Sequence, residues 1–260
     1  MTLNDLYDMS SSGKPYTLFM DLHTSDELLR NALAFNGDSW VNEESGNISL
    51  GDDFKKYLEI ASKLPKSDDE YDELSGLGEI IFDIKFLNAS VDDLSYDYMV
   101  MWRNALGEPA YVGFPTNSNS GSAIRPSGTF MICSDRASAP GCWEFVRTFL
   151  ATEYQDSLTN GIPVVKSSFE RWKTDISYDG IDENMYYIYV DGVEQLVPLI
   201  SPDKAEELSE NIISCRKYYF MNPAIEEIII RNSHDYFDGK ISADEAAFNA
   251  EKEVEEYLKG

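Results

Sequence analysis

The chain has few side chains of the kinds that most often carry out chemistry. Its two histidines, His23 and His234, stand apart from any cysteine or carboxylate at the spacing of a metal site. The three cysteines, Cys133, Cys142 and Cys215, also lack that spacing, and an odd number does not make a disulfide framework. No GxSxG, GxGxxG, P-loop or HExxH pattern occurs. We therefore expect no metal site, no cofactor and no catalytic motif.

The residues that stand out as candidates for ligand binding are aromatic residues near turns and strand ends. They are Phe86, Trp102, Phe114 and the run Tyr218-Tyr219-Phe220, which precedes Asn222-Pro223. A sugar or peptide pocket uses such rings, because one ring face covers C–H surface while amides and hydroxyls orient the ligand. The alternative for each ring is packing in the core. The 47 carboxylates also allow a glycosidase-like pair, but no pair is singled out.

Net charge and hydropathy limit the kinds of partner that the chain can bind. The formal net charge is −26, with 47 acidic and 21 basic residues, and no basic cluster offsets it. Such a surface repels phosphate backbones and anionic lipids, so we expect no nucleic-acid partner. The chain contains no run of about 18 apolar residues, and its start has no basic region followed by an apolar one. We expect neither a membrane span nor an export signal in the chain as given.

Strands and helices alternate along the first half of the chain. A strand at 17–22 is followed by a helix that begins near Ser25 and runs through Leu33. A hairpin with its turn at 44–47 precedes a helix capped by Asp52 or Asp53 and ended by Pro65. Further on, the pattern predicts strands at 78–86, 110–114 and 129–133, a weak helix at 91–102 and a long loop at 107–128.

The second half is predicted to be mainly helical. A helix at 137–150 should turn Trp143, Val146, Phe149 and Leu150 inward. A hairpin with Asp191-Gly192 at its turn follows, and then three helices. The first two helices cover 202–215 and 223–237. A capping box of Ser242 and Glu245 begins the last, which should pack through its apolar side, Ala247, Ala250, Val254, Tyr257 and Leu258. These elements indicate the α/β class.

Several segments together resemble a known family. They are MTLNDLYD, GEIIFDIKF, YVGFPT with the Gly/Ser-rich loop after it, APGCWEFVRTFLATEYQ, GIPVVKSSFE and the closing YFDGKISADEAAFNAEKEVEEYL. In order and spacing they are similar to the C-terminal half to two-thirds of a family 1 bacterial extracellular solute-binding protein, the receptor lipoprotein of ABC importers. Each motif is degenerate, and the match comes from their order across nearly all of the chain.

The resemblance implies a periplasmic-binding-protein-like (type II) α/β fold of two lobes. It assigns 1–128 to the first part of the C-terminal lobe, 129–165 to a partial N-terminal lobe with hinge crossings, and 166–260 to the closing helices of the C-terminal lobe. The family's lipoprotein signal and first lobe are missing from the start, so we expect a part of a longer, extracellular and cell-surface attached parent. The helix with Trp143 and Phe149 would then expose an apolar patch and favour self-association.

The resemblance also implies a function without catalysis. The protein would bind a small solute, most often a sugar or oligosaccharide, between the lobes and deliver it to ABC permease subunits. The binding residues it implies lie after the first two strands, in the loop near Phe114 and before the helix at 223: His23, Thr24, Ser25, Lys85, Phe86, Phe114, Asn117, Asn119, Tyr219 and Asn222. No metal ligand or cofactor is implied. The alternatives are a secreted carbohydrate-active enzyme and a cell-surface structural module.

Overall fold

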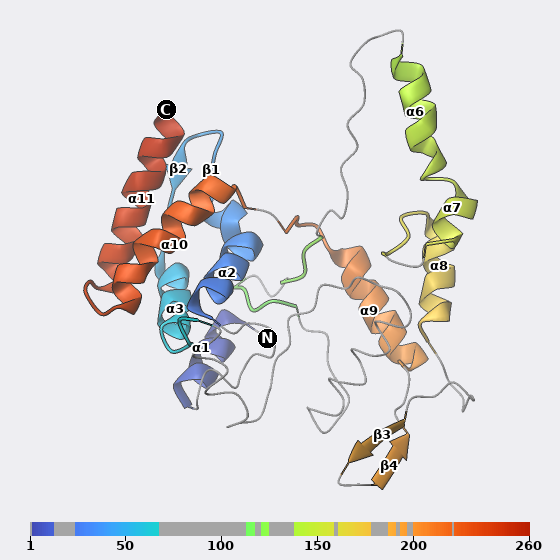
Figure 1. Ribbon diagram of the computed structural model, residues 1–260, viewed down its shortest axis with the longest axis horizontal. Coiled ribbons are helices and arrows are strands. Elements are labelled where there is room, and N and C mark those ends of the chain that lie inside the picture. Colours follow the sequence, from blue (N-terminus) through green and yellow to red (C-terminus); the bar gives the residue numbers. More distant parts are fainter. Residues whose placement is uncertain are drawn as a thin grey trace. The chain divides into compact units, whose positions relative to one another are not determined.

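The computed structural model describes residues 2–12, 24–67, 113–117, 121–124, 138–158, 161–177, 187–190, 193–196, 200–219 and 221–260. Within these ranges the chain is mostly helical, with two small antiparallel sheets of two strands each (Figure 1). It divides into two compact units. Unit 1 consists of Met1–Lys85, Val112–Arg125 and Cys215–Gly260, and unit 2 of Phe86–Tyr111 and Pro126–Ser214.

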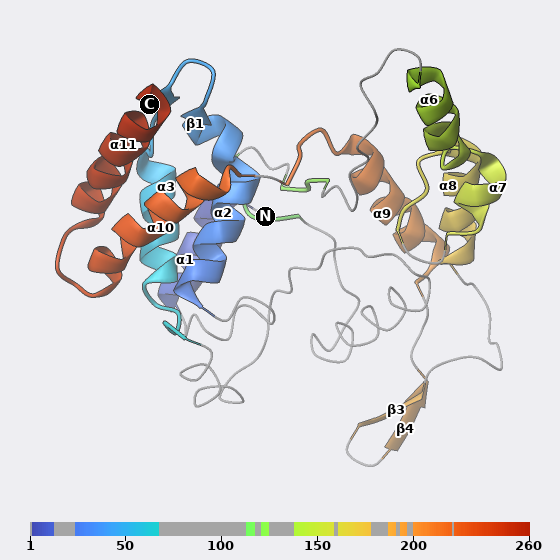
Figure 2. The ribbon, with the colours of Figure 1, turned by 45° about the horizontal axis from the view of Figure 1, so that its top comes forward.

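Unit 1 contains a helical body. Three helices come from the start of the chain and two from its end, and Figure 2 shows α10 and α11 beside α2 and α3. A short hairpin, with two residues in each strand, joins α2 to α3; Val41 pairs with Ile48. The elements are α1 (Leu3–Ser12), α2 (Ser25–Trp40), β1 (Val41–Asn42), β2 (Asn47–Ile48), α3 (Asp52–Ala61), α10 (Pro223–Phe237) and α11 (Ala243–Lys259).

Helix α2 begins where its sequence predicts. The Thr24 side chain accepts from the backbone N–H of Glu27, and the Glu27 carboxylate accepts from the Thr24 N–H at 3.0 Å. This capping box satisfies two N–H groups that would otherwise lack partners. The helix then continues beyond Leu33 to Trp40, because Trp40 supplies another buried apolar side chain two turns further on.

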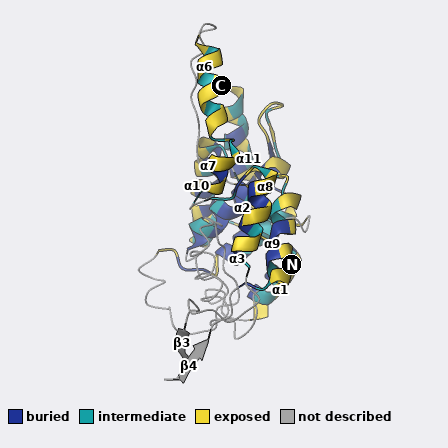
Figure 3. Ribbon diagram, turned by 90° about the vertical axis from the view of Figure 1, so that its right-hand side faces the viewer, coloured by how far each residue is buried: buried dark blue, intermediate teal, exposed yellow. Residues whose placement is uncertain are grey.

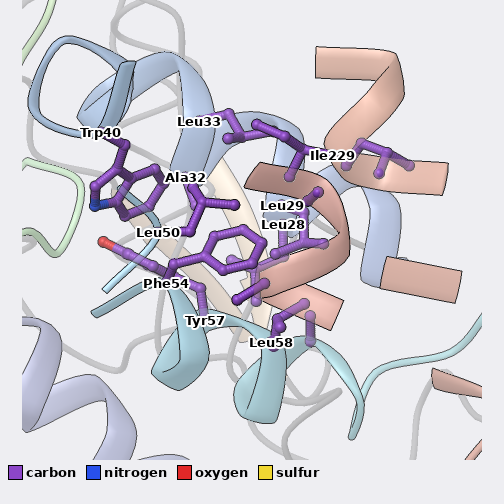
Figure 4. Packing of buried hydrophobic residues seen from close by; sticks show 14 of the residues in the cluster. Leu28, Leu29, Ala32, Leu33, Trp40, Leu50, Phe54, Tyr57, Leu58 and Ile229 are labelled. Carbon is purple, nitrogen blue, oxygen red and sulfur yellow. The ribbon is translucent and has the colours of Figure 1, made fainter. Parts of the chain in front are cut away.

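The core of unit 1 lies between α2, α3, α10 and α11. Its apolar side chains come from one stripe of each helix, and Figure 4 shows Trp40, Phe54 and Tyr57 packed against the leucines of α2. Trp40 meets Phe54 and Tyr57 edge to face, with ring centroids 5.6 and 5.9 Å apart. Ile229 of α10 joins the same cluster and is fully buried. Segments from the two ends of the chain therefore share one core.

Helices α10 and α11 form the predicted hairpin at the chain end. Gly239 follows the C-terminal end of α10 and lies in the left-handed region, with φ 71°, which glycine adopts without steric cost. Ser242 and Glu245 then form the predicted capping box. Small side chains, Ala246, Ala247 and Ala250, are buried and let α11 pack closely on α10.

Unit 2 contains helices and one hairpin in its described part. Helix α8 packs against α7 and α9, and Phe169 and Trp172 of α8, with Ile176 just after it, share a small apolar cluster with Leu208 of α9. In the hairpin, Val190 lies opposite Val193, which agrees with the predicted two-residue turn. The elements are α6 (Ala139–Thr148), α7 (Thr152–Asp156), α8 (Lys166–Asp175), β3 (Tyr187–Val190), β4 (Val193–Leu196) and α9 (Pro202–Ser214).

Two local predictions are wrong in detail. Gly51, with no side-chain hydrogen bond, occupies the cap of α3, so neither Asp52 nor Asp53 caps it; both carboxylates lie inside the first turn, where they favour the positive end of the helix dipole. Tyr257 was expected on the packed side of α11 but is 47% exposed.

Helix α6 differs most from its prediction. Trp143 and Leu150 were expected to turn inward, yet they are 52% and 48% exposed, and none of the residues of α6 is buried (Figure 3). Val146 and Phe149 are half-buried. The described part of unit 2 supplies no helix that covers this face. The exposed apolar surface agrees with the expected patch, and self-association through it stays a prediction.

Among the described residues, the coarse fold class is mostly helical with small two-stranded sheets. The predicted strands at 17–22, 78–86 and 129–133 and the helix at 91–102 lie outside the described residues. Of the strand predicted at 110–114, only Gly113 and Phe114 are described, and neither is in a strand. The type II fold and the lobe boundaries at 128 and 165 stay predictions.

Truncating a core ring should destabilise unit 1 far more than truncating a surface ring. Phe54→Ala removes a fully buried ring, and we expect a loss of about 3–5 kcal/mol in the free energy of unfolding by urea titration. Phe248→Ala is the matched control, because that ring is 64% exposed on α11. It should change stability by less than about 0.5 kcal/mol. Equal losses in both variants would contradict the core described here.

The capping box of α11 should add an acid-sensitive contribution to stability. The backbone N–H of Ser242, and then its hydroxyl, hold the pKa of Glu245 below its usual value. A depressed pKa gives stability that is present above the pKa of the unfolded chain, about 4.3, and lost as pH falls through the folded value. Glu245→Gln removes this titration. The difference between its urea midpoint and that of the unmodified chain should shrink as the pH is lowered from 7 to 3. A difference that stays constant over this range would contradict the assignment.

Candidate ligand-binding site

Three separate segments of unit 1 bring aromatic rings together. We call Phe35, Phe114 and Tyr219 the aromatic cluster; they come from α2, from the segment at 113–117 and from the segment before α10. Phe35 stacks on Phe114 with ring centroids 4.6 Å apart and planes at 6°, and it meets Tyr219 edge to face at 5.2 Å. Phe114 also stacks on Tyr57 of the core at 5.9 Å.

The three rings differ in how far they reach solvent. Phe114 is only 4% exposed, so it forms the floor of the cluster. Phe35 and Tyr219 are half-buried, and their outer parts are accessible. Phe35 and Tyr219 are therefore the rings that can contact a ligand.

Two asparagines of α2 lie beside the rings. The Asn31 carbonyl oxygen accepts from the Tyr219 hydroxyl at 3.1 Å, while its amide donates to the Glu27 carbonyl. The Asn36 amide donates to the Ala32 carbonyl and to the Tyr57 hydroxyl at 3.2 Å. Rings and amides at one place are what a small polar ligand with apolar faces requires.

The Tyr57 hydroxyl holds the Phe114 segment on α3. It donates to the Pro115 carbonyl in a buried contact. Burial is the main cause that raises the pKa of Tyr57, so this hydroxyl keeps its proton and remains a donor at any physiological pH.

The segment around Phe114 closes on itself through its backbone. The Phe114 N–H donates to the Gly121 carbonyl at 2.9 Å, and Gly113 adopts φ 69°. A Cβ on Gly121 would lie 1.6 Å from the Phe114 carbonyl oxygen, so only glycine fits. Further along, the Tyr219 N–H donates to the Ile124 carbonyl at 2.8 Å, which ties the segment before α10 to this loop.

Two of the predicted binding residues cap or anchor α2. Thr24 is the N-cap of the helix and is 8% exposed. Ser25 is 2% exposed, and its hydroxyl donates to the Ala61 carbonyl at 2.8 Å. Both side chains are occupied by the fold, so their local structure gives them a positioning role.

Asn117 and Asn222 lie apart from the rings in their hydrogen bonding. The Asn117 amide donates to Asp53 of α3. Asn222 caps α10, since its side-chain oxygen accepts from the Ala224 N–H, and its amide donates to Glu43 at 2.9 Å. Of the predicted set, the structure thus brings together Phe114 and Tyr219. The remaining four, His23, Lys85, Phe86 and Asn119, lie outside the described residues.

Sequence reasoning missed three residues of this site. Asn31 and Phe35 are four positions apart on α2 and share a face, with Asn36 next to it. The available signal was this polar and aromatic spacing on a helix whose other apolar residues are core. Its role shows only in the tertiary structure, where Phe35 stacks on Phe114 and meets Tyr219.

Other site types find no support in the described part of the chain. Among the described residues, no three His, Cys, Asp or Glu side chains gather as a metal site requires. Cys142 and Cys215 are free and half-buried. A search of the described helices finds none that is long and apolar enough to cross a membrane.

Comparison with known proteins adds no relative. No protein-family model matches the chain, and no curated protein is significantly similar to it. The likeness to solute-binding proteins therefore rests on the sequence segments given above.

A side chain on Gly121 should disrupt the loop under the aromatic cluster. Gly121→Ala forces Phe114 away from Tyr57 and Phe35, because the new Cβ would overlap the Phe114 carbonyl. We expect a loss of about 1–3 kcal/mol in unfolding free energy and a weaker near-ultraviolet dichroism of the rings. Gly141→Ala is the control, since a Cβ there meets nothing within 4 Å and helical alanine is favoured. An unchanged spectrum for Gly121→Ala would refute the loop geometry.

Proposed function

We propose that the chain is the substrate-binding component of an ABC importer. It binds a small solute, a sugar or oligosaccharide, and delivers it to a membrane permease without chemical change. The chain carries out this role outside the cell, as part of a lipoprotein attached to the surface.

The observation that carries the proposal is the aromatic cluster with its two asparagines. Residues from α2, the Phe114 loop and the segment before α10 converge there, although they lie far apart in the sequence. Two of these three segments are those that the family resemblance assigns to ligand binding. The convergence supports a binding site in preference to ordinary core packing, because Phe35 and Tyr219 remain partly accessible.

The chemistry of the site fits a carbohydrate. A pyranose presents a C–H face that a ring covers and hydroxyls that amides bind. In the proposed complex the solute covers Phe35 and Tyr219, while Asn31 and the Tyr219 hydroxyl exchange their mutual hydrogen bond for bonds to sugar hydroxyls. Buried Phe114 stacks on Phe35 and so supports Phe35 and, through it, Tyr219.

The organisation of the chain also supports the proposal. Each compact unit is assembled from discontinuous segments, so the chain passes between the units at 85–86, 111–112, 125–126 and 214–215. A receptor that closes by a hinge needs two bodies linked by several such crossings.

A thermal-shift screen of monosaccharides and oligosaccharides tests the proposal. A sugar at about 100 times its Kd should stabilise the folded state by about 2.7 kcal/mol, which raises the melting temperature by several degrees. Tyr219→Ala should then weaken the binding of that sugar about tenfold or more by calorimetry, or about 1.4 kcal/mol.

Two further variants sharpen the result. Tyr219→Phe keeps the ring but removes the hydroxyl that donates to Asn31, so it should lose less affinity than Tyr219→Ala. Phe248→Ala, on the exposed face of α11, should leave affinity unchanged. If no sugar shifts the melting temperature, or if Tyr219→Ala binds as the unmodified chain does, the proposed site is wrong.

A further inference from the structure

Helix α8 of unit 2 carries two buried polar groups without partners. The Ser168 hydroxyl and the Trp172 indole N–H make no hydrogen bond, although both residues are buried, at 2% and 6% exposure. Buried polar groups in native proteins are almost always bonded, so an orphan group points to a bound water, ion or ligand. Two such groups four residues apart lie on the same face of one helix.

The start of α8 is also without a cap. Val165 occupies the N-cap position, and its side chain makes no hydrogen bond with the first N–H groups of the helix. These groups and the helix dipole make such an end favourable for an anion. Every residue of the first turn lacks negative charge.

Ser168 stands close to this end of the helix. Side chains of an α-helix tilt toward its N-terminus, and a residue in the third position reaches back over the first turn, as Glu245 does in α11. Ser168 holds that third position in α8. Trp172 lies over the preceding turn, since its ring stacks on Phe169 at 5.4 Å.

The segment that leads into α8 is anchored, and the start of the helix is accessible to solvent. The Val164 N–H donates to the side chain of buried Gln155 at 2.7 Å, which anchors the segment before α8 on α7. Val164 is 73% exposed, and Lys166 and Ser167 are exposed as well. The outer end of α8 can therefore meet a solute.

The charges of the described residues around the start of α8 are compatible with the binding of an anion there. Two described carboxylates are already paired: Asp156 with Arg171 at 3.3 Å, and Glu170 with Lys173 at 3.0 Å. Within the described ranges, Lys166 forms no ion pair. Its ammonium group remains available at the first position of the helix, where a bound anion would lie.

From these observations we infer that the N-terminus of α8 binds a small oxyanion, such as phosphate or a carboxylate of similar size. The anion accepts hydrogen bonds from the first N–H groups of the helix and from the Ser168 hydroxyl, and Lys166 supplies the opposite charge. This site lies in unit 2 and is independent of the carbohydrate site proposed for unit 1.

Inorganic phosphate tests this inference directly. The intact chain is titrated with phosphate at constant ionic strength and followed by melting temperature and by tryptophan fluorescence. Phosphate also stabilises proteins nonspecifically by exclusion from their surface, but that effect acts equally on close variants. The comparison between variants therefore isolates binding.

Ser168→Ala is the decisive variant. Without phosphate it should melt at or above the temperature of the unmodified chain, because it removes an unpartnered hydroxyl. With phosphate it should lose the specific shift, with affinity weakened about tenfold or more. Lys166→Gln should weaken binding while leaving the melting temperature without phosphate unchanged, because Lys166 is exposed.

Ser209→Ala is the matched control. Ser209 is equally buried on α9, but its hydroxyl donates to the Ala205 carbonyl at 2.6 Å. It should lower the melting temperature and keep the phosphate shift. The inference fails if phosphate shifts the unmodified chain and Ser168→Ala equally, if it shifts neither, or if Ser168→Ala melts as low as Ser209→Ala. None of these outcomes bears on the sugar screen with Tyr219 variants.

Discussion

Apolar packing of α2 against α10 joins the two ends of the chain. Leu28, Leu29 and Leu33 meet the isoleucines of α10 in a core from which water is excluded. At the rim, Arg30 pairs with Glu226, 196 positions away in the sequence. This ion pair is only partly buried and adds little stability, so the buried apolar area carries most of the contact. Without it, the segment before α10 would have no fixed place beside α2.

The proposed carbohydrate site is an extension of that core. Tyr57 packs with Trp40 on one side and stacks on Phe114 on the other, while its hydroxyl holds the Pro115 carbonyl. Phe114 in turn supports Phe35 and, through it, Tyr219. The site can therefore be rigid without being built on a single element, because each ring is held by another whose position the core fixes. The proposed anion site in unit 2 follows a different logic, in which helix termini and unsatisfied donors create the affinity.

Local sequence signals located the ends of helices well. The start of α2 near Ser25, the capping box at Ser242, the stop at Gly239 and the pairing of Val190 with Val193 all agree with predictions from interactions over three or four residues. The same reasoning failed at α6, whose apolar stripe predicted burial. Periodicity reveals which side of a helix is apolar, but burial needs a partner element, and the described part of unit 2 provides none for that side.

The sequence alone indicated where α2, α9, α10 and α11 begin and which faces of these helices are apolar, because these properties depend on neighbours within one or two turns. Only the tertiary structure decided that Phe35, Phe114 and Tyr219 meet, that Thr24 and Ser25 serve the fold, and that Ser168 and Trp172 lack partners. Each of these depends on packing between elements distant in sequence. Such contacts are selected by the total area buried and by the geometry of the whole unit, and no short stretch of sequence contains that information.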